Sequence, residues 1–255
     1  MTKNYLDIKK FKNKLNLGFF TSNGGVSKGD YFSLNCSTNN DDKKNNILRN
    51  LKIAQKNLGI KDKKLKLINQ IHSKKTYLIN KKNFKNNFFG DGLITKDKKI
   101  ALGVLTADCA PIFIFDKNKS IICCLHAGWK GALKNIIQEA IKKIKIQNKK
   151  SRDIIAIIGP CLATKNFEVD KRFKVKFLDK NIKYKKYFKI KNKNKDIFDL
   201  RGLINYQLKA QGIENIYNIK KDTYKNKEIF FSHRRAFHEN NKRTGRMINI
   251  ISFKD

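Results

Sequence analysis

The chain has 255 residues with 58 Lys or Arg against 21 Asp or Glu, a formal net charge of +37 at pH 7. This length allows one large domain with a sizeable core, and we expect a single domain over residues 1–255. The lysines spread over the whole length among abundant Asn and Ile, with no single basic block interleaved with aromatics, which disfavours a specific nucleic-acid partner. A bias in an AT-rich coding sequence would produce the same pattern at tolerant surface positions.

The first half of the chain contains one amphipathic segment followed by short apolar runs. Apolar residues at close to helical spacing predict a helix over residues 45–58, and Gly59 is well placed to end it. Runs rich in β-branched residues predict strands at 64–68, 76–79, 100–105, 112–115, 120–125 and 154–158. Between the last two, apolar residues on one stripe predict a helix over 132–146.

In the second half of the chain, the signals for helices and strands are less regular. Residues 171–195 are dominated by lysine, asparagine and aromatics without a clear period, which predicts an exposed excursion rather than a domain linker. A helix is expected over 200–210, closed by Gly212, and strands at 216–219, 229–232 and 247–253. Helices and strands mix without a strict βαβ rhythm, so we expect an α+β fold of mixed β-sheets with flanking helices.

Cysteine usage and the N-terminus bear on location. The five cysteines are odd in number and lack the close spacing of a disulfide framework, which favours a reducing compartment. Residues 1–14 are polar and lysine-rich, without the apolar core of a signal peptide. The longest apolar stretch, residues 100–115, is interrupted by Asp108, so no membrane span is expected. We predict a cytoplasmic protein.

Three separated segments each place a metal-competent side chain in a turn-like sequence, namely His72, Cys109 and His126. Two imidazoles and one thiolate suit a borderline-soft divalent ion, and three protein ligands leave a fourth position open for water or substrate. The spacings of 37 and 17 residues match no zinc-finger pattern, so the fold must assemble the site. Strand alternation puts Cys124 on the same face as His126, where packing is its expected role.

The same residues allow a different chemistry. Cys109 beside His126 or His72 would be an activated nucleophile in a metal-independent cysteine hydrolase, because a nearby imidazole stabilises the thiolate. Asp108, next to Cys109, is a candidate for proton transfer or for orienting a ligand. A third alternative is a basic nucleic-acid-associated binding protein, whose affinity would fall steeply with salt.

Arginines gather near the C-terminus of a chain whose basic residues are mostly lysine. Arg234, Arg235 and Arg246 are candidates for binding phosphate, because the planar guanidinium offers paired donors that lysine lacks. His233 and His238 are candidate acids or bases, and neighbouring cations should keep His233 neutral.

The motifs resemble the laccase-domain or YfiH-like family over nearly the whole chain. The resemblance is strongest at His126-Ala127-Gly128-Trp129-Lys130-Gly131, and it includes Gly24-Gly25-Val26-Ser27, Gln70-Ile71-His72, Asp91-Gly92-Leu93-Ile94-Thr95, Thr106-Ala107-Asp108-Cys109-Ala110-Pro111, Ile158-Gly159-Pro160-Cys161, Ser232-His233-Arg234-Arg235 and Thr244-Gly245-Arg246. It implies α/β/β/α-type layering and zinc bound by His72, Cys109 and His126.

The resemblance also implies an activity. It implies phosphorolysis of adenosine, inosine and S-methyl-5'-thioadenosine to the free base and the (methylthio)ribose 1-phosphate, with some adenosine deamination. Purine nucleoside and inorganic phosphate are then the expected partners. Copper is associated with the family through a laccase activity, but multicopper chemistry needs many more than the four histidines present.

The chain departs from the family pattern at four positions. Ser22 and Leu51 stand where relatives commonly carry arginine, Asp222 replaces a frequent cysteine, and His233 stands where tyrosine is frequent. None of these departures falls on the three expected ligands.

Overall fold

The computed structural model describes residues 4–11, 13–147, 153–241 and 243–254, so residues 1–3 and 12 of the polar N-terminal segment lie outside it. One large sheet runs β1-β2-β14-β6-β3, formed by Tyr5–Leu6, Leu15–Phe20, Met247–Phe253, Ile100–Thr106 and Lys64–Lys66. The other runs β13-β9-β7-β8-β5-β4, formed by Asn215–Asn218, Ile154–Ile158, Ala110–Asp116, Ile122–Ala127, Gly92–Thr95 and Thr76–Ile79.

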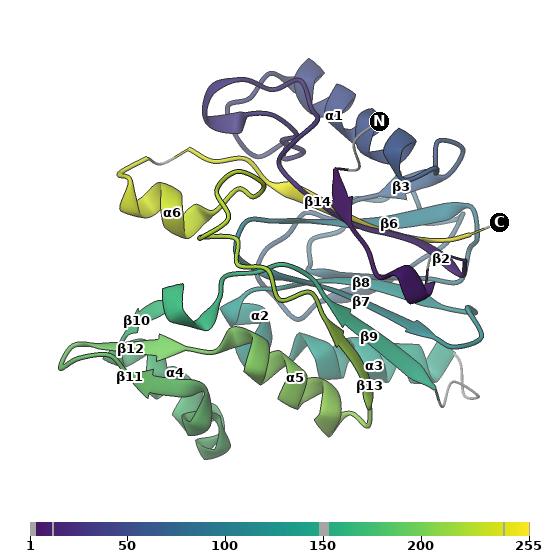
Figure 1. The fold of residues 1–255 in the computed structure, drawn as a ribbon. Helices are drawn as coiled ribbons and strands as arrows, with labels where there is room; N and C mark the ends of the chain where they lie inside the picture. Colours follow the sequence, from purple (N-terminus) through teal and green to yellow (C-terminus); the bar gives the residue numbers. More distant parts are fainter. Residues whose placement is uncertain (1–3, 12, 148–152, 242, 255) are drawn as a thin grey trace.

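Helices cover the outer faces of the two sheets (Figure 1). The α-helices α1 to α6 are Lys44–Asn57, Trp129–Leu133, Ile136–Gln147, Lys171–Lys180, Leu200–Ala210 and His233–His238. The 3-10 helices η1 to η4 are Lys9–Phe11, Gly29–Tyr31, Thr164–Asn166 and Ile182–Tyr187. None of the helices in the described ranges is both long and apolar enough to span a bilayer.

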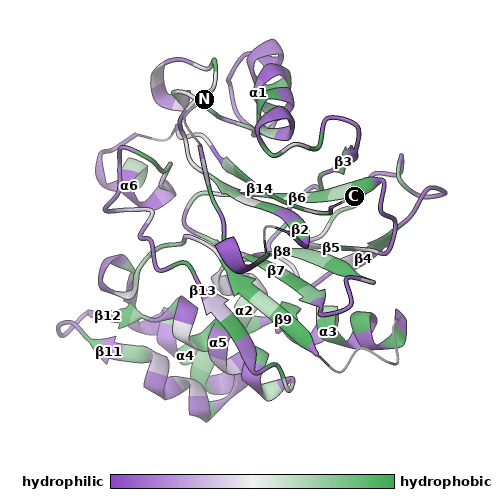
Figure 2. Cartoon of the chain, turned by 45° about the vertical axis from the view of Figure 1, so that its right-hand side comes forward, coloured by the Kyte–Doolittle hydropathy of each residue, from purple (hydrophilic) through white to green (hydrophobic). Residues whose placement is uncertain are grey.

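Strand alternation supplies both faces of each sheet with apolar side chains. On β14, Ile250 packs toward α1 and Ile251 packs toward the second sheet, because successive side chains point to opposite faces. Between the sheets the rings of Phe19 and Phe113 stack with centroids 4.3 Å apart. Figure 2 shows the apolar strands β7 and β9 in the interior, beneath mixed outer helices. The expected α+β fold with α/β/β/α layering is confirmed.

The expected exposed excursion over residues 171–195 is wrong. This segment forms α4, η4 and β11 (Phe188–Ile190). With β10 (Glu168–Asp170) and β12 (Lys195–Phe198), which flank the segment, β11 makes a small sheet of order β10-β12-β11. Phe177 and Phe198 are fully buried with ring centroids 4.9 Å apart, and Phe188 lies 4.9 Å from Phe198. The aromatic rings therefore make a local core, whose period the many exposed lysines conceal in the sequence. We call residues 167–199 the aromatic lobe.

The single helix expected over residues 132–146 is also wrong, because the chain forms α2 and then α3. Asn135 adopts φ of 65° between them, in the left-handed region that asparagine tolerates better than most residues. Both helices still bury their apolar stripe against the six-stranded sheet, as Ala132 and Ile136 show. The apolar period over residues 132–146 therefore predicts which side chains are buried, but it does not predict the break between α2 and α3.

Residues 229–232, expected as a strand, form a turn that leads into α6. The backbone N–H groups of Ile229 and Phe230 donate to the carbonyl of Asn226, and Ser232 caps α6 by accepting from Arg235 N at 3.1 Å. Phe230 and Phe231 are buried against Ala107 and Met247 rather than paired in a sheet. The other predicted helices and strands are present within a few residues of their expected ends, while β1, β2 and β5 were not foreseen.

Asn135 gives a test of the helix break. Asn135→Ala should lower the free energy of unfolding by about 1 kcal/mol, because a Cβ without a compensating polar group is strained at positive φ. Asn135→Gly should cost less than Asn135→Ala, since glycine adopts this φ freely. Urea unfolding of the three proteins measures the order, and an alanine variant as stable as the parent would contradict the conformational argument.

Candidate metal centre

The fold brings His72, Cys109 and His126 together. Their ligand atoms all lie within 4.8 Å of one another, and the two imidazole centroids are 4.9 Å apart. His72 follows β3 in a loop, His126 lies near the end of β8, and Cys109 lies where the chain passes from β6 in one large sheet to β7 in the other. Two imidazoles and one thiol in this arrangement form a set that can hold a borderline-soft divalent ion.

Asp91 organises this cluster. Its buried carboxylate accepts from the backbone N–H of His72 at 3.0 Å and contacts His126 Nδ1 at 2.8 Å through Oδ1. Its other oxygen, Oδ2, accepts from the backbone N–H and the hydroxyl of Ser73 at 2.5 and 2.8 Å. With Nδ1 engaged by Asp91, His126 has Nε2 left for a metal, which is the usual role of a carboxylate behind a ligating histidine. Sequence reasoning missed this role, although the Asp91-Gly92 pair before an apolar run marks the position.

The charges of the site act in opposite directions on its two histidines. Partial burial and the neighbouring His126 lower the pKa of His72 to about 4, so that its imidazole is neutral and able to bind a metal at pH 7. For His126 burial lowers the pKa, but the charge of Cys109 and the hydrogen bond to Asp91 outweigh it and raise the pKa to about 9. A metal bound between Cys109 and His126 would displace that proton.

Gly128 leaves the space that such an ion would need. A Cβ on Gly128 would lie 2.7 Å from Cys109 Sγ and 3.1 Å from His72 Nδ1, so only glycine leaves these two atoms unobstructed. The donor set, the carboxylate behind His126 and this open space together fit a divalent metal such as zinc.

Backbone strain marks two of the site residues. His72 has φ of 54° and Asp108 has φ of 87°, conformations that cost of the order of 1–3 kcal/mol for non-glycine residues. Hydrogen bonds hold both in place. The carboxylate of Asp108 accepts from Thr223 Oγ1 and from Arg234 N, each at 2.6 Å, so it ties the cysteine turn to the start of α6.

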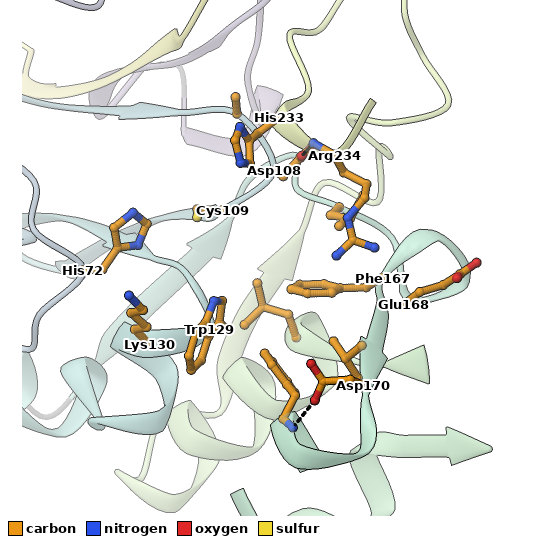
Figure 3. A pocket seen from close by; sticks show the side chains of 15 residues that line it. His72, Asp108, Cys109, Trp129, Lys130, Phe167, Glu168, Asp170, His233 and Arg234 are labelled. Carbon is orange, nitrogen blue, oxygen red and sulfur yellow. Dashed lines mark hydrogen bonds between the residues drawn. The ribbon is translucent and has the colours of Figure 1, made fainter. Parts of the chain in front are cut away.

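Two cavities meet at the cluster, and Figure 3 shows the first of them. The first, of about 480 Å³, we call the aromatic cavity, because Trp129, Phe167 and Phe173 line it, with Lys130 and Arg234 at its edges. The second, of about 500 Å³, we call the polar cavity, and its lining includes Thr38, Asn69, Gln70, Asn87 and Arg246. Both volumes lie in the range of small-molecule sites.

The three candidate arginines are placed differently. Arg234 lines the aromatic cavity, where its guanidinium lies 5.5 Å from the Phe167 ring centroid and donates to Asn166 O. Arg246 lines the polar cavity, and its Nη1 donates to Thr244 O and Gly245 O. The structure does not bring Arg235 to the cluster, because its guanidinium donates three hydrogen bonds to the carbonyls of Thr223, Tyr224 and Phe230.

Comparison with known proteins shows the family of this chain. The sequence model of the family described as multi-copper polyphenol oxidoreductase laccase matches residues 16–254. The chain belongs to this family. It is 34% identical over 206 residues to a purine nucleoside phosphorylase of Rickettsia conorii, covering 77% of this chain and 82% of that protein. It is 36% identical over 222 residues to a purine nucleoside phosphorylase of Campylobacter jejuni, covering 84% and 90%.

The fold of a family member is the same. The crystal structure of the hypothetical protein YfiH of Bacillus licheniformis superposes with a TM-score of 0.88 at 26% identity, covering 99% of this chain and 97% of that one. The laccase-like architecture expected from the motifs is therefore confirmed for this chain.

Gly128 offers a direct test of the metal site. Gly128→Ala should lower the affinity for zinc by at least about tenfold, because the new Cβ displaces a ligand atom by several tenths of an ångström. Gly131→Ala is the matched control, since its Cβ would meet no atom closer than 3.4 Å. Zinc affinity is measured by competition with a chromophoric chelator. Equal affinity of the two variants would contradict the assigned geometry.

Asp91→Asn tests the carboxylate behind His126. The amide would turn an NH2 group toward N–H donors that now face a carboxylate oxygen. We expect zinc affinity to fall by about 10- to 100-fold, the loss typical when the group behind a ligating histidine is changed. Asp97→Asn, at a turn aspartate whose Oδ1 accepts from Lys99 N, serves as control. The same competition titration reports the result, and unchanged affinity in Asp91→Asn would remove Asp91 from the site.

Proposed function

We propose that this protein is a zinc-dependent purine nucleoside phosphorylase acting on adenosine, inosine and S-methyl-5'-thioadenosine, with adenosine deaminase activity. The observation that carries the proposal is the position of the three-ligand cluster at the meeting point of an aromatic and a polar cavity. Such a pair of cavities suits two different substrates that must meet. The relatives named purine nucleoside phosphorylase support the class of reaction, phosphorolysis of a purine nucleoside. The absence of disulfide spacing in the sequence supports a cytoplasmic location.

The two reactants differ in a way that matches the two cavities. A purine has flat apolar faces, for which Trp129, Phe167 and Phe173 offer a matching wall. Phosphate needs cationic and polar donors, which Arg246 and the amide side chains of the polar cavity supply. We therefore place the nucleoside in the aromatic cavity and phosphate in the polar cavity. His72 and Cys109 line both, so the reacting atoms would meet beside them.

Phosphorolysis is then a displacement at the anomeric carbon. An oxygen of phosphate forms a bond to that carbon while the bond to the purine nitrogen breaks, and the departing base takes up the electron pair and a proton. Ribose 1-phosphate and free base result. Arg246 would hold the phosphate in place, and Arg234 would lie along the nucleoside side of the site.

His72, Cys109 and His126 would hold the zinc ion. When bound, zinc would supply a water molecule of lowered pKa, the nucleophile that deamination of adenosine needs. Copper is not part of the proposal, because four histidines are too few for multicopper chemistry.

The decisive experiment combines metal analysis with product analysis. Purified protein should contain about one zinc per chain. With phosphate it should convert adenosine to adenine and ribose 1-phosphate, and without phosphate it should release inosine. Cys109→Ser should lose both the metal and both activities, whereas Cys36→Ala, at a cysteine buried on the far side of the five-stranded sheet beside α1, should keep them.

Two results would overturn the proposal. If metal-loaded protein forms neither adenine nor inosine from adenosine, the proposal is refuted. A protein without metal whose Cys109 is alkylated rapidly and stoichiometrically would instead indicate the cysteine hydrolase, a chemistry that the charged contact between Cys109 and His126 would also serve.

Arg246 tests the assignment of the phosphate side. Arg246→Gln should raise the KM for phosphate by about 10- to 100-fold, because a charge-assisted hydrogen bond is lost, and should change the KM for adenosine much less. Arg235→Gln should instead lower the unfolding midpoint, since its guanidinium holds three backbone carbonyls. Initial rates at varied phosphate and thermal unfolding distinguish the two effects. An unchanged phosphate KM in Arg246→Gln would place the anion elsewhere.

A further inference from the structure

The two cavities share only four of the described residues, and this short set points to one further functional group. The shared residues are His72, Ala107, Cys109 and His233. Two of them are candidate metal ligands, and alanine carries no polar group. His233 is therefore the one remaining side chain in the described lining that can hydrogen-bond to molecules on both sides.

The position of His233 is held firmly by the backbone around it. It is the first residue of α6, and the backbone N–H groups of the next two residues donate to Asp108 Oδ2 at 2.6 Å and to Ser232 Oγ at 3.1 Å. Asp108 precedes Cys109, so the start of α6 is tied to the cysteine turn. Figure 3 shows the imidazole reaching over the cavity from α6, with Cys109 between it and Trp129.

The imidazole itself is left available. Among the described residues, no side chain or backbone group makes a hydrogen bond to the His233 ring, and its side chain is exposed to the space of the cavities. By contrast, His238 at the other end of α6 contacts the Tyr224 hydroxyl through Nδ1 at 3.0 Å. An anchored backbone with a free polar ring is the arrangement expected of a group that binds a ligand.

We propose that His233 is a substrate-binding residue that contacts both reactants, the phosphate from one side and the sugar of the nucleoside from the other. This inference rests on the proposed phosphorylase function. One ring nitrogen donates to a phosphate oxygen, and the other accepts from a hydroxyl group of the sugar. By touching both molecules, His233 aligns them for the displacement at the anomeric carbon.

The charges around His233 favour the form of the ring that this role requires. Partial removal from water and then the nearby Arg246 lower the pKa of His233, while Asp108 raises it and Arg234 lowers it further. The ring is therefore neutral at pH 7, and a neutral imidazole has one donor and one acceptor nitrogen. A charged ring would have two donors and could not accept from a sugar hydroxyl.

The test measures the KM for adenosine and for phosphate separately in four proteins with equal zinc content. In His233→Ala both values should rise, each by about tenfold, because one hydrogen bond to each molecule is lost. His233→Gln keeps one donor and one acceptor and should recover most of the loss. His238→Ala is the control on the same helix and should match the parent protein, because His238 lines neither cavity and so is not the acid or base considered from the sequence.

The outcomes separate this inference from the proposed function. If the parent protein cleaves adenosine with phosphate but His233→Ala changes neither KM, or changes only one, the double contact is refuted. If the parent protein shows no phosphate-dependent cleavage, the proposed function fails. Calorimetric titration with phosphate and with adenosine then tests whether His233 contacts these two ligands. Equal dissociation constants in the parent protein and His233→Ala for either ligand would refute the contact independently.

Discussion

The geometry of the site depends on the way Asp91 joins two elements. Its backbone carbonyl accepts from His126 N at 2.8 Å at the end of the β5 and β8 pairing, and its side chain meets the imidazole of the same histidine. Asp91 thus extends the pairing of two strands by one hydrogen bond and orients one candidate metal ligand. The same carboxylate holds the backbone of His72 in its left-handed conformation. One buried charge therefore positions both imidazoles, and its hydrogen bonds explain why it is tolerated in the interior.

The location of the cluster follows from the layered fold. Cys109 lies at the crossover from one large sheet to the other, where the chain must turn and the two apolar layers separate. The two cavities meet at this junction, since Ala107 and Cys109 line both. The aromatic lobe closes one side through Phe167 and Phe173, and the C-terminal arginine region closes the other through Arg246. Asp108 connects the crossover to α6, so that the start of this helix is held relative to Cys109.

The success of sequence reasoning varied with the kind of signal. Short apolar runs rich in β-branched residues predicted most strands of the two large sheets, because strands such as β7 and β14 are buried on both faces. Helical apolar spacing predicted α1, α3 and α5, which bury one face. The same reasoning failed for the aromatic lobe, where the many exposed lysines conceal the period of a core built from a few rings. It also failed at Asn135, since the break between α2 and α3 depends on one backbone dihedral angle that leaves the buried stripe unchanged. Arginine enrichment drew attention to the C-terminal region but could not separate Arg235, which holds carbonyl groups, from Arg246, which lines a cavity.

The sequence by itself determined the chemical types available to the site: two imidazoles, one thiol and a group of arginines, in an order that resembles one family. It also indicated mixed β-sheets with flanking helices, because helices and strands follow one another without a strict βαβ rhythm, and the resemblance implied how they are layered. Only the tertiary structure decided that Asp91 stands behind His126, that two cavities meet at Cys109, and that His233 borders both. These facts depend on contacts between residues far apart in the chain. Such contacts leave no local pattern in the sequence, because each residue also fits the helix, strand or turn pattern of its own segment.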